Sequence, residues 1–308
     1  MILYRWRGET TNFGDELNTI LWPALLPGFF DDDPSTRFLG IGSILDRRHP
    51  PGTRKLVAGA AYGGYEGKPV LDKTWTVHWV RGPRTAAALG LPNSLGLGDP
   101  ALLLPHALTT KAEPGSGIGF MPHFESAARG AWQRAADLAG VTLIDPRARP
   151  LEVLSQIARC RVLLGEALHG IIVADAMRVP WVAIRPLARI HRPKWRDWAE
   201  TVDVVPRFAK MPPSTLAEWF GRGPTFAMQR PASKRLIARA ARALAGAAQA
   251  EPQLSPDAAL ERCQSRLLDA VVHLRRHPDA PPSRITPAGW RSYLRSADDS
   301  AYEPVPIG

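Results

Sequence analysis

The sequence predicts an α/β protein of two doubly wound domains, and three observations support this. Short apolar runs alternate with helical stretches in the first third of the chain. A cleaner β-α-β-α-β-α-β alternation follows from residue 117 to residue 186. A length of 308 residues is long for one hydrophobic core and comfortable for two. Ligands of such domains bind beyond the carboxyl ends of the strands, so we expect a site between the two domains.

Residues 1–112 are assigned to the first domain. Apolar runs predict strands or strand ends at 37–45, 55–62, 75–82 and 93–104, and helical patterns lie at 14–26 and 83–91. Proline and glycine cluster at 111–117, which we take as the domain linker.

Residues 113–210 are assigned to the second, Rossmann-like domain. Its predicted strands are 117–124, 141–146, 161–166 and 180–186, and its predicted helices are 125–140, 150–160 and 167–178. Residues 211–308 are predicted to form a helical, Ala/Arg-rich extension, followed from residue 277 by a proline-rich tail.

Composition narrows the class of protein. No apolar run approaches the length of a membrane span, and the N-terminus lacks the apolar segment of a signal peptide. With only two cysteines the chain has no disulfide framework, so we expect a cytoplasmic protein. The net charge of +10 is open to two interpretations, a solvated basic face or peripheral contact with the inner membrane. No motif supports binding to nucleic acid.

The segment around His169 is the first candidate site. Gly165 to Gly170 lie where a predicted strand becomes a helix, and the free N–H groups of a helix N-terminus attract anions there. Glu166 and His169 are three residues apart, which predicts one shared helix face. Gly170 permits close approach of a ligand or of another backbone. The structural alternative is that Glu166 and His169 cap each other.

A basic segment follows the next predicted strand. Residues 185–198 read as a loop in which tryptophans are interleaved with cations, among them Arg189, Arg192 and Lys194. Arginine forks and a lysine ammonium can hold phosphate and carboxylate together. A solvated basic loop is the alternative.

Polar residues also mark strand ends and a helix start in the first domain. Asn12 and Asp15 open a predicted helix that either can cap, while Ser43, Arg81 and Asp99 follow apolar runs. Each is a plausible ligand contact, although each alone is more often structural.

Taken together, these strings resemble the polysaccharide pyruvyl transferase family. They are, in order, NFGDELN, GIGSIL, WVRGPRT, LGDPALL, IGFMPH, GEALHGIIVADAMRVPWV and KWRDW, within residues 10–200. The pattern L-H-G-x-x-V-A-D-A is the most specific, and the resemblance is greatest to the branch acting on succinoglycan-type exopolysaccharides. Ala167 departs from the family, which often has Ser or Arg there, as does the segment near residue 59, where G-S-G is common.

The resemblance implies a fold like the two-domain GT-B glycosyltransferases, with phosphoenolpyruvate as co-substrate and no metal or other cofactor. It implies a sugar of a lipid-linked repeat unit as acceptor. On the residues, Glu166 and His169 are the expected catalytic pair, in roles that can be exchanged. Donor contacts are assigned to Arg189, Arg192, Lys194 and Gly170, and acceptor contacts to Asn12, Asp15, Ser43, Arg81 and Asp99.

Two other functions and one other chemistry remain open. A GT-B glycosyltransferase using a nucleotide sugar would share the architecture, and a non-catalytic polysaccharide-binding or assembly protein could keep the fold. A metal-dependent version would use the acidic run Asp31-Asp32-Asp33 as its cation site.

Overall fold

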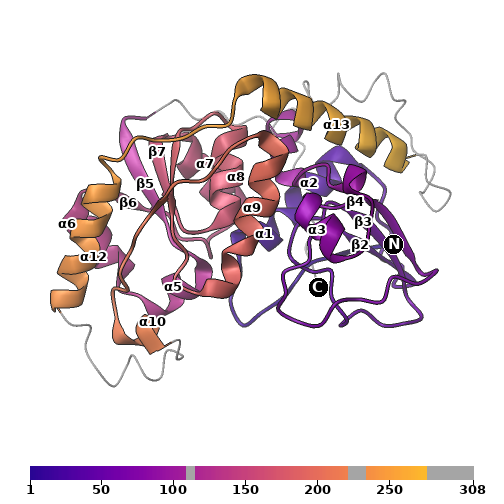
Figure 1. Ribbon diagram of the computed structural model, residues 1–308, viewed down its shortest axis with the longest axis horizontal. Helices are drawn as coiled ribbons and strands as arrows, with labels where there is room; N and C mark the ends of the chain where they lie inside the picture. The colour runs from indigo at the N-terminus through magenta and orange to yellow at the C-terminus, as the bar shows by residue number, and fades with distance from the viewer. Residues whose placement is uncertain (109–114, 221–233, 276–308) are drawn as a thin grey trace.

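The computed structural model describes residues 1–108, 115–220 and 234–275, which form two parallel β-sheets with helices packed around them (Figure 1). The predicted α/β class with two sheets is confirmed. The predicted linker at 111–117 falls mostly outside these ranges, and the proline-rich tail lies wholly outside them.

The first sheet is parallel, with strands in the order β1-β2-β3-β4. Its strands are β1 (Ile2–Tyr4), β2 (Thr36–Leu39), β3 (Arg54–Ala58) and β4 (Trp75–Trp79). Buried apolar side chains from adjacent strands, such as Phe38 and Val57, explain why these short runs form strands. Three of the predicted strands are confirmed, and β1 was not predicted.

Helices and 3₁₀ turns complete the first domain: α1 (Phe13–Glu16), α2 (Asn18–Leu25), α3 (Pro83–Ala88), η1 (Asn93–Leu95), η2 (Pro100–Leu103) and α4 (Leu104–Ala107). The strand predicted at 93–104 is wrong. Asp99 caps η2 there by accepting a hydrogen bond from the Ala101 amide, and Pro100 occupies the first helical position. Proline suits that position because its missing N–H would have no partner in the helix.

The second sheet is also parallel, in the order β6-β5-β7-β8-β9. It contains β5 (Gly117–Met121), β6 (Thr142–Leu143), β7 (Cys160–Gly165), β8 (Trp181–Ile184) and β9 (Phe208–Ala209). The four predicted strands are confirmed, and the short edge strand β9 was missed.

The helices of this sheet are α5 (Phe124–Arg129), α6 (Trp132–Ala139), α7 (Pro150–Ala158) and α8 (Leu168–Ala176). The single helix predicted at 125–140 is in fact two. At Gly130, between them, a Cβ atom would lie 2.3 Å from Nε1 of Trp132, so a side chain there would collide with the indole. Every residue of α8 except His169 is buried, which makes it the central helix between the two halves of the molecule.

The basic segment predicted as a loop is largely helical. It contains η3 (Arg189–His191) and α9 (Pro193–Ala199), followed by η4 (Glu200–Val202). Pro193 starts α9 at its first position, and Trp195 and Trp198, three residues apart, are both fully buried. The sequence signal missed here was the proline as a helix start.

The described residues beyond this segment contain the helices α10 (Leu216–Phe220), α12 (Lys234–Ala247) and α13 (Asp257–Arg275). Helix α12 packs against α6, and α13 runs across to the first domain (Figure 1). Their apolar residues, such as Leu244 and Leu267, are buried in the protein. No helix within the described ranges has both the length and the apolar character needed to cross a membrane.

One continuous hydrophobic core joins the two sheets. It includes Trp22, Phe38 and Trp79 from the first domain with Ile171 and Trp181 from the second. The two domains are therefore fixed against each other, and the residues at their junction are held in place by packing on both sides.

Candidate active site

The first turn of α8 places His169 against a buried carboxylate of the first domain. Its Nε2 lies 3.3 Å from Oδ2 of Asp99, and their side chains are 14% and 1% exposed. Burial raises the pKa of Asp99, but the nearby charges of His169 and Arg81 and the amide of Ala101 outweigh burial and leave that pKa lowered. The contact between Asp99 and His169 is an ion pair without hydrogen-bond geometry. Asp99 is therefore ionised and orients the imidazole.

The other side of the imidazole faces α1. A Cβ atom on Gly14 would lie 2.0 Å from Nδ1 of His169, so only glycine leaves room for the ring. The next residue, Asp15, is buried, and burial is the main reason that its pKa is raised to about 6. The Asn12 hydrogen bond, followed by the charges of His169 and Lys194, acts in the opposite direction.

Asn12 occupies the N-cap position of α1 but makes no capping bond through its side chain. Its amide instead donates to Oδ2 of Asp15 at 2.6 Å. The expectation that the side chain of Asn12 or Asp15 caps the helix is therefore wrong, and the two side chains bond to each other instead.

Arg81 follows β4 and links the first sheet to α9. Its Nε donates to Oδ2 of Asp197 at 3.1 Å, and its Nη1 lies 3.5 Å from the hydroxyl of Ser43. Thr85 holds the same Asp197 through its amide and hydroxyl groups. The third guanidinium nitrogen, Nη2, is buried and has no hydrogen-bond partner in the described part of the chain.

Lys194 lies in the first turn of α9, and its ammonium group is near charges from both domains. Burial chiefly, and then Arg81, lower its pKa to about 8, whereas Asp15, Glu125 and Glu166 act to raise it. No carboxylate within residues 1–108, 115–220 and 234–275 forms an ion pair with this ammonium group. Lys194 is thus a partly buried cation available to an anionic ligand.

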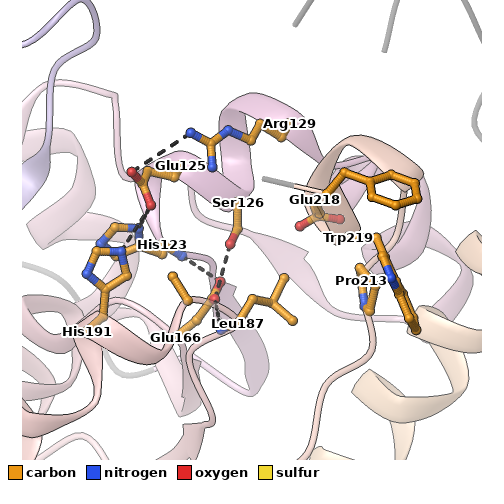
Figure 2. Close-up of a pocket in the computed structure, with 12 residues that line it drawn as sticks. His123, Glu125, Ser126, Arg129, Glu166, Leu187, His191, Pro213, Glu218 and Trp219 are labelled. Carbon is orange, nitrogen blue, oxygen red and sulfur yellow. Dashed lines mark hydrogen bonds and ion pairs between the residues drawn. The ribbon is translucent and has the colours of Figure 1, made fainter. Parts of the chain in front are cut away.

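Glu166 points away from His169. Its carboxylate accepts hydrogen bonds from the amides of His123 and Leu187, at 2.9 and 3.0 Å, and from the Ser126 hydroxyl at 3.1 Å (Figure 2). Burial raises its pKa, and these hydrogen bonds only partly oppose the effect. Because Glu166 precedes α8, the predicted shared helix face is wrong, and the two side chains share no hydrogen bond that would make them a mutual cap.

Three residues predicted to contact the donor have other surroundings. Arg189 is exposed, and Arg192 donates from Nε to the carbonyl of Pro186 at 3.2 Å, which braces its own loop. Gly170 packs against β5, since a Cβ atom there would lie 2.5 Å from Sδ of Met121. The close approach at Gly170 is therefore to another side chain of the protein.

Sequence reasoning missed a second polar group beside Glu166. His123, Glu125 and His191 line a cavity of about 440 Å³ together with Glu166 (Figure 2). The hydroxyl of Tyr65, from the first domain, lies 2.9 Å from Nδ1 of His191. The position of His123 directly after a strand was the signal that could have found it.

The acidic run at 31–33 has other roles. Asp31 pairs with the N-terminal amine, and Asp33 accepts hydrogen bonds from the amide and hydroxyl of Ser35. Among the described residues, the potential metal ligands that lie close enough together to bind one ion are instead those of His123, Glu125 and His191.

Comparison with known proteins identifies the family of the chain. Residues 63–186, which include Arg81, Asp99, Glu166 and His169, match the model of the family described as polysaccharide pyruvyl transferase. The chain is 36% identical over 316 residues to succinoglycan biosynthesis protein ExoV of Rhizobium meliloti (strain 1021), covering 89% of this chain and 98% of that protein. No solved structure gives a significant match. The chain therefore belongs to the polysaccharide pyruvyl transferase family and is a transferase.

Proposed function

We propose that the protein transfers a pyruvyl group from phosphoenolpyruvate to a sugar of an exopolysaccharide repeat unit, forming a pyruvate ketal and releasing phosphate. The succinoglycan role in the name of its relative supports an exopolysaccharide acceptor. The family favours this reaction over nucleotide-sugar transfer and over a purely binding role.

One observation carries the donor assignment: two cations at the domain junction have unused binding capacity. Nη2 of Arg81 is buried without a partner, and Lys194 has no carboxylate in contact, within the part of the chain that the structure describes. Phosphoenolpyruvate carries a phosphate and a carboxylate on a small enol. An arginine fork and a lysine ammonium together can neutralise these two groups.

His169 is the proposed proton-transfer residue. Its Nε2 forms an ion pair with Asp99 at 3.3 Å, so a buried carboxylate stabilises the protonated imidazole. Glu166, whose carboxylate already accepts three hydrogen bonds, is proposed to position the His123 and Leu187 loops.

Asp15 is the proposed base toward the acceptor, supported by its neighbour Asn12. A carboxyl with a pKa of about 6 is mostly ionised at neutral pH and can still accept a proton. Ser43, whose hydroxyl lies 3.5 Å from Nη1 of Arg81, is a further proposed acceptor contact.

The proposed reaction conserves atoms and protons. C3 of the enol gains a proton, one sugar hydroxyl forms a bond to C2, the C2–O–phosphate bond breaks, and the second hydroxyl closes the ring. Of the two hydroxyl protons, one ends on C3 and the other leaves with phosphate. Positive charge from Arg81 and Lys194 stabilises the departing phosphate.

The same proposal places the protein in the cytoplasm, where phosphoenolpyruvate is available, with an acceptor linked to lipid at the inner membrane. The net charge of +10 supports attraction to acidic lipid headgroups. The apolar residues of α12 and α13 are buried in the protein. Contact with the membrane would therefore depend on charge and not on an apolar helix face.

Donor binding tests the assignment. Phosphoenolpyruvate should raise the melting temperature of the wild type, and UDP- and GDP-sugars should not. Lys194→Met should abolish the shift, whereas Arg196→Met, on the exposed side of the same helix, should retain it. A shift by nucleotide sugars alone would replace the proposal with glycosyl transfer.

A further inference from the structure

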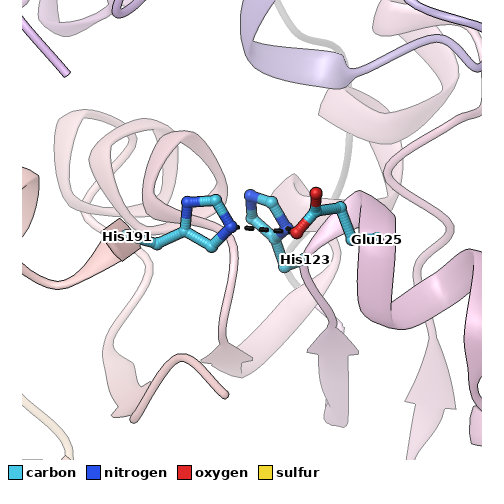
Figure 3. A group of neighbouring side chains, drawn as sticks. All are labelled: His123, Glu125 and His191. Atoms are coloured by element: carbon cyan, nitrogen blue, oxygen red, sulfur yellow. Dashed lines mark hydrogen bonds and ion pairs between the residues drawn. The ribbon is translucent and has the colours of Figure 1, made fainter. Parts of the chain in front are cut away.

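Three side chains from different elements of the second domain converge beside the proposed active site (Figure 3). His123 follows β5, Glu125 lies in the first turn of α5, and His191 ends η3 after β8. Their ligand atoms all lie within 4.8 Å of one another. Both histidines are buried, and the carboxylate of Glu125 is 31% exposed.

The distances within this group resemble those between ligands of one metal ion. Oε2 of Glu125 lies 3.0 Å from Nε2 of His191 and 3.7 Å from Nδ1 of His123. In a tetrahedral site with bonds of about 2.0–2.1 Å, neighbouring ligand atoms are about 3.3–3.4 Å apart. The two observed separations lie on either side of that value, and the imidazoles are already stacked, with centroids 4.1 Å apart.

The surroundings supply an outer partner and an open position. The hydroxyl of Tyr65 lies 2.9 Å from Nδ1 of His191, so a ring that binds metal through Nε2 can donate its Nδ1 proton to that oxygen. The group also lines the cavity of about 440 Å³, which leaves room for a fourth ligand. Of the carboxylates that line this cavity, Glu125 is the one whose pKa is lowered, chiefly by its hydrogen bond to His191, whereas burial raises the pKa of Glu166 and raises that of Glu218 to about 7. Glu125 is therefore the carboxylate that can offer a negative charge to a cation, in competition with Arg129 at 3.9 Å.

We propose that His123, Glu125 and His191 form a binding site for a divalent ion of the zinc class. Nδ1 of His123, Nε2 of His191 and Oε2 of Glu125 are the ligands, and the fourth position faces the cavity and takes water or an oxygen of a bound anion. Two imidazoles and one carboxylate are a ligand set that Zn²⁺ uses when one position stays open. This differs from the expectation, drawn from the family resemblance, that no metal is involved.

Metal retention by the full-length protein tests this site without any measurement of activity. After treatment with a chelator and dialysis against Zn²⁺, the wild type should retain one equivalent. Glu125→Gln and His191→Gln should each lower the affinity by more than the roughly 100-fold that loss of an outer partner can cost, because each loses a ligand. His273→Gln, which changes an exposed histidine of α13, should bind as the wild type does.

Spectroscopy of the cobalt-loaded protein identifies the ligands. Co²⁺ in the wild type should give the intense visible absorption of a four-coordinate site, and Glu125→Gln should remove it. Tyr65→Phe should retain the metal with an affinity lowered about 10- to 100-fold, as for an outer partner. Failure of the wild type to retain Zn²⁺, or equal retention by Glu125→Gln and His191→Gln, would overturn the proposal. Either result leaves the donor-binding test above unaffected.

Discussion

Glu166 and His169 lie three residues apart at one strand-to-helix turn, yet their surroundings differ in kind. The Glu166 carboxylate is held by three donors from the second domain and is fixed in place. The His169 imidazole forms an ion pair at one nitrogen with Asp99 of the first domain, and its other nitrogen faces the Gly14–Asp15 segment. Nearness in sequence therefore does not give these residues a shared role, because the chain changes direction between them.

This contrast assigns chemistry to one residue and positioning to the other. A group that must exchange a proton needs an atom that is not already committed, and His169 retains one. A carboxylate with its hydrogen bonds already made is better suited to hold two loops in register. Substitutions at the two residues test these roles separately.

The largest expected effect is on turnover at His169. His169→Gln should lower the rate of phosphate release from phosphoenolpyruvate about 10²- to 10⁴-fold, the usual contribution of a proton-transfer group. Its urea unfolding midpoint should stay close to that of the wild type. The control His273→Gln should keep full turnover. Retention of most activity by His169→Gln would end the assignment.

Two ion pairs between the β4–α3 segment and the α9–η4 segment separate the effects of buried and exposed charge. Asp197→Ala leaves Arg81 buried without its partner and should destabilise the fold by about 3–5 kcal/mol. Arg84 and Glu200 are 51% and 41% exposed, so Glu200→Ala should cost no more than about 1 kcal/mol. Urea unfolding of both variants measures the difference. Equal losses would show that the junction is not packed as described.

Glu166→Gln should affect stability more than chemistry. The new amide nitrogen would face hydrogen-bond donors, which should cost about 1–3 kcal/mol. The turnover of the folded fraction should stay within about tenfold of the wild type, unlike that of His169→Gln. Thermal unfolding and phosphate release, measured on the same preparation, check both statements. A turnover loss as large as that of His169→Gln would restore Glu166 as the proton donor.

The smallest effect is a pH dependence from Lys194. Its pKa of about 8 means that the ammonium is protonated at lower pH and is lost as pH rises through that value. The affinity for phosphoenolpyruvate should therefore be full below about pH 8 and fall about tenfold per pH unit above it. Titration calorimetry across this range measures it. In Lys194→Met the dependence should disappear, and an unchanged profile there would assign it to another group.

The spacing of apolar residues and the positions of glycine and proline predicted most of the fold, because the strands of parallel sheets are nearly continuous apolar runs. What they missed depended on single residues: Pro193 starting α9, Pro100 and Asp99 starting η2, and Gly130 dividing α5 from α6. In each case a local backbone constraint overrode the apolar pattern.

The site was predictable only in part. The sequence indicates where strands end, but it does not indicate which side chains at those ends come into contact. The tertiary fold brings together His169, Asp99, Asp15, Arg81 and Lys194 from both domains, as expected of residues at strand and helix termini. The pairing of Arg81 with Asp197, and the group formed by His123, Glu125 and His191, depend on contacts between segments more than 60 residues apart. No local pattern specifies such contacts.

The most direct test of the central claim is the mass of the product. The wild type, incubated with phosphoenolpyruvate and oligosaccharides derived from succinoglycan without pyruvate, should add the mass of one pyruvic acid less one water. One phosphate should be released for each sugar modified, and His169→Gln should yield neither. An unmodified sugar in the presence of phosphate release, or a product carrying an added hexose from a nucleotide sugar, would contradict the account.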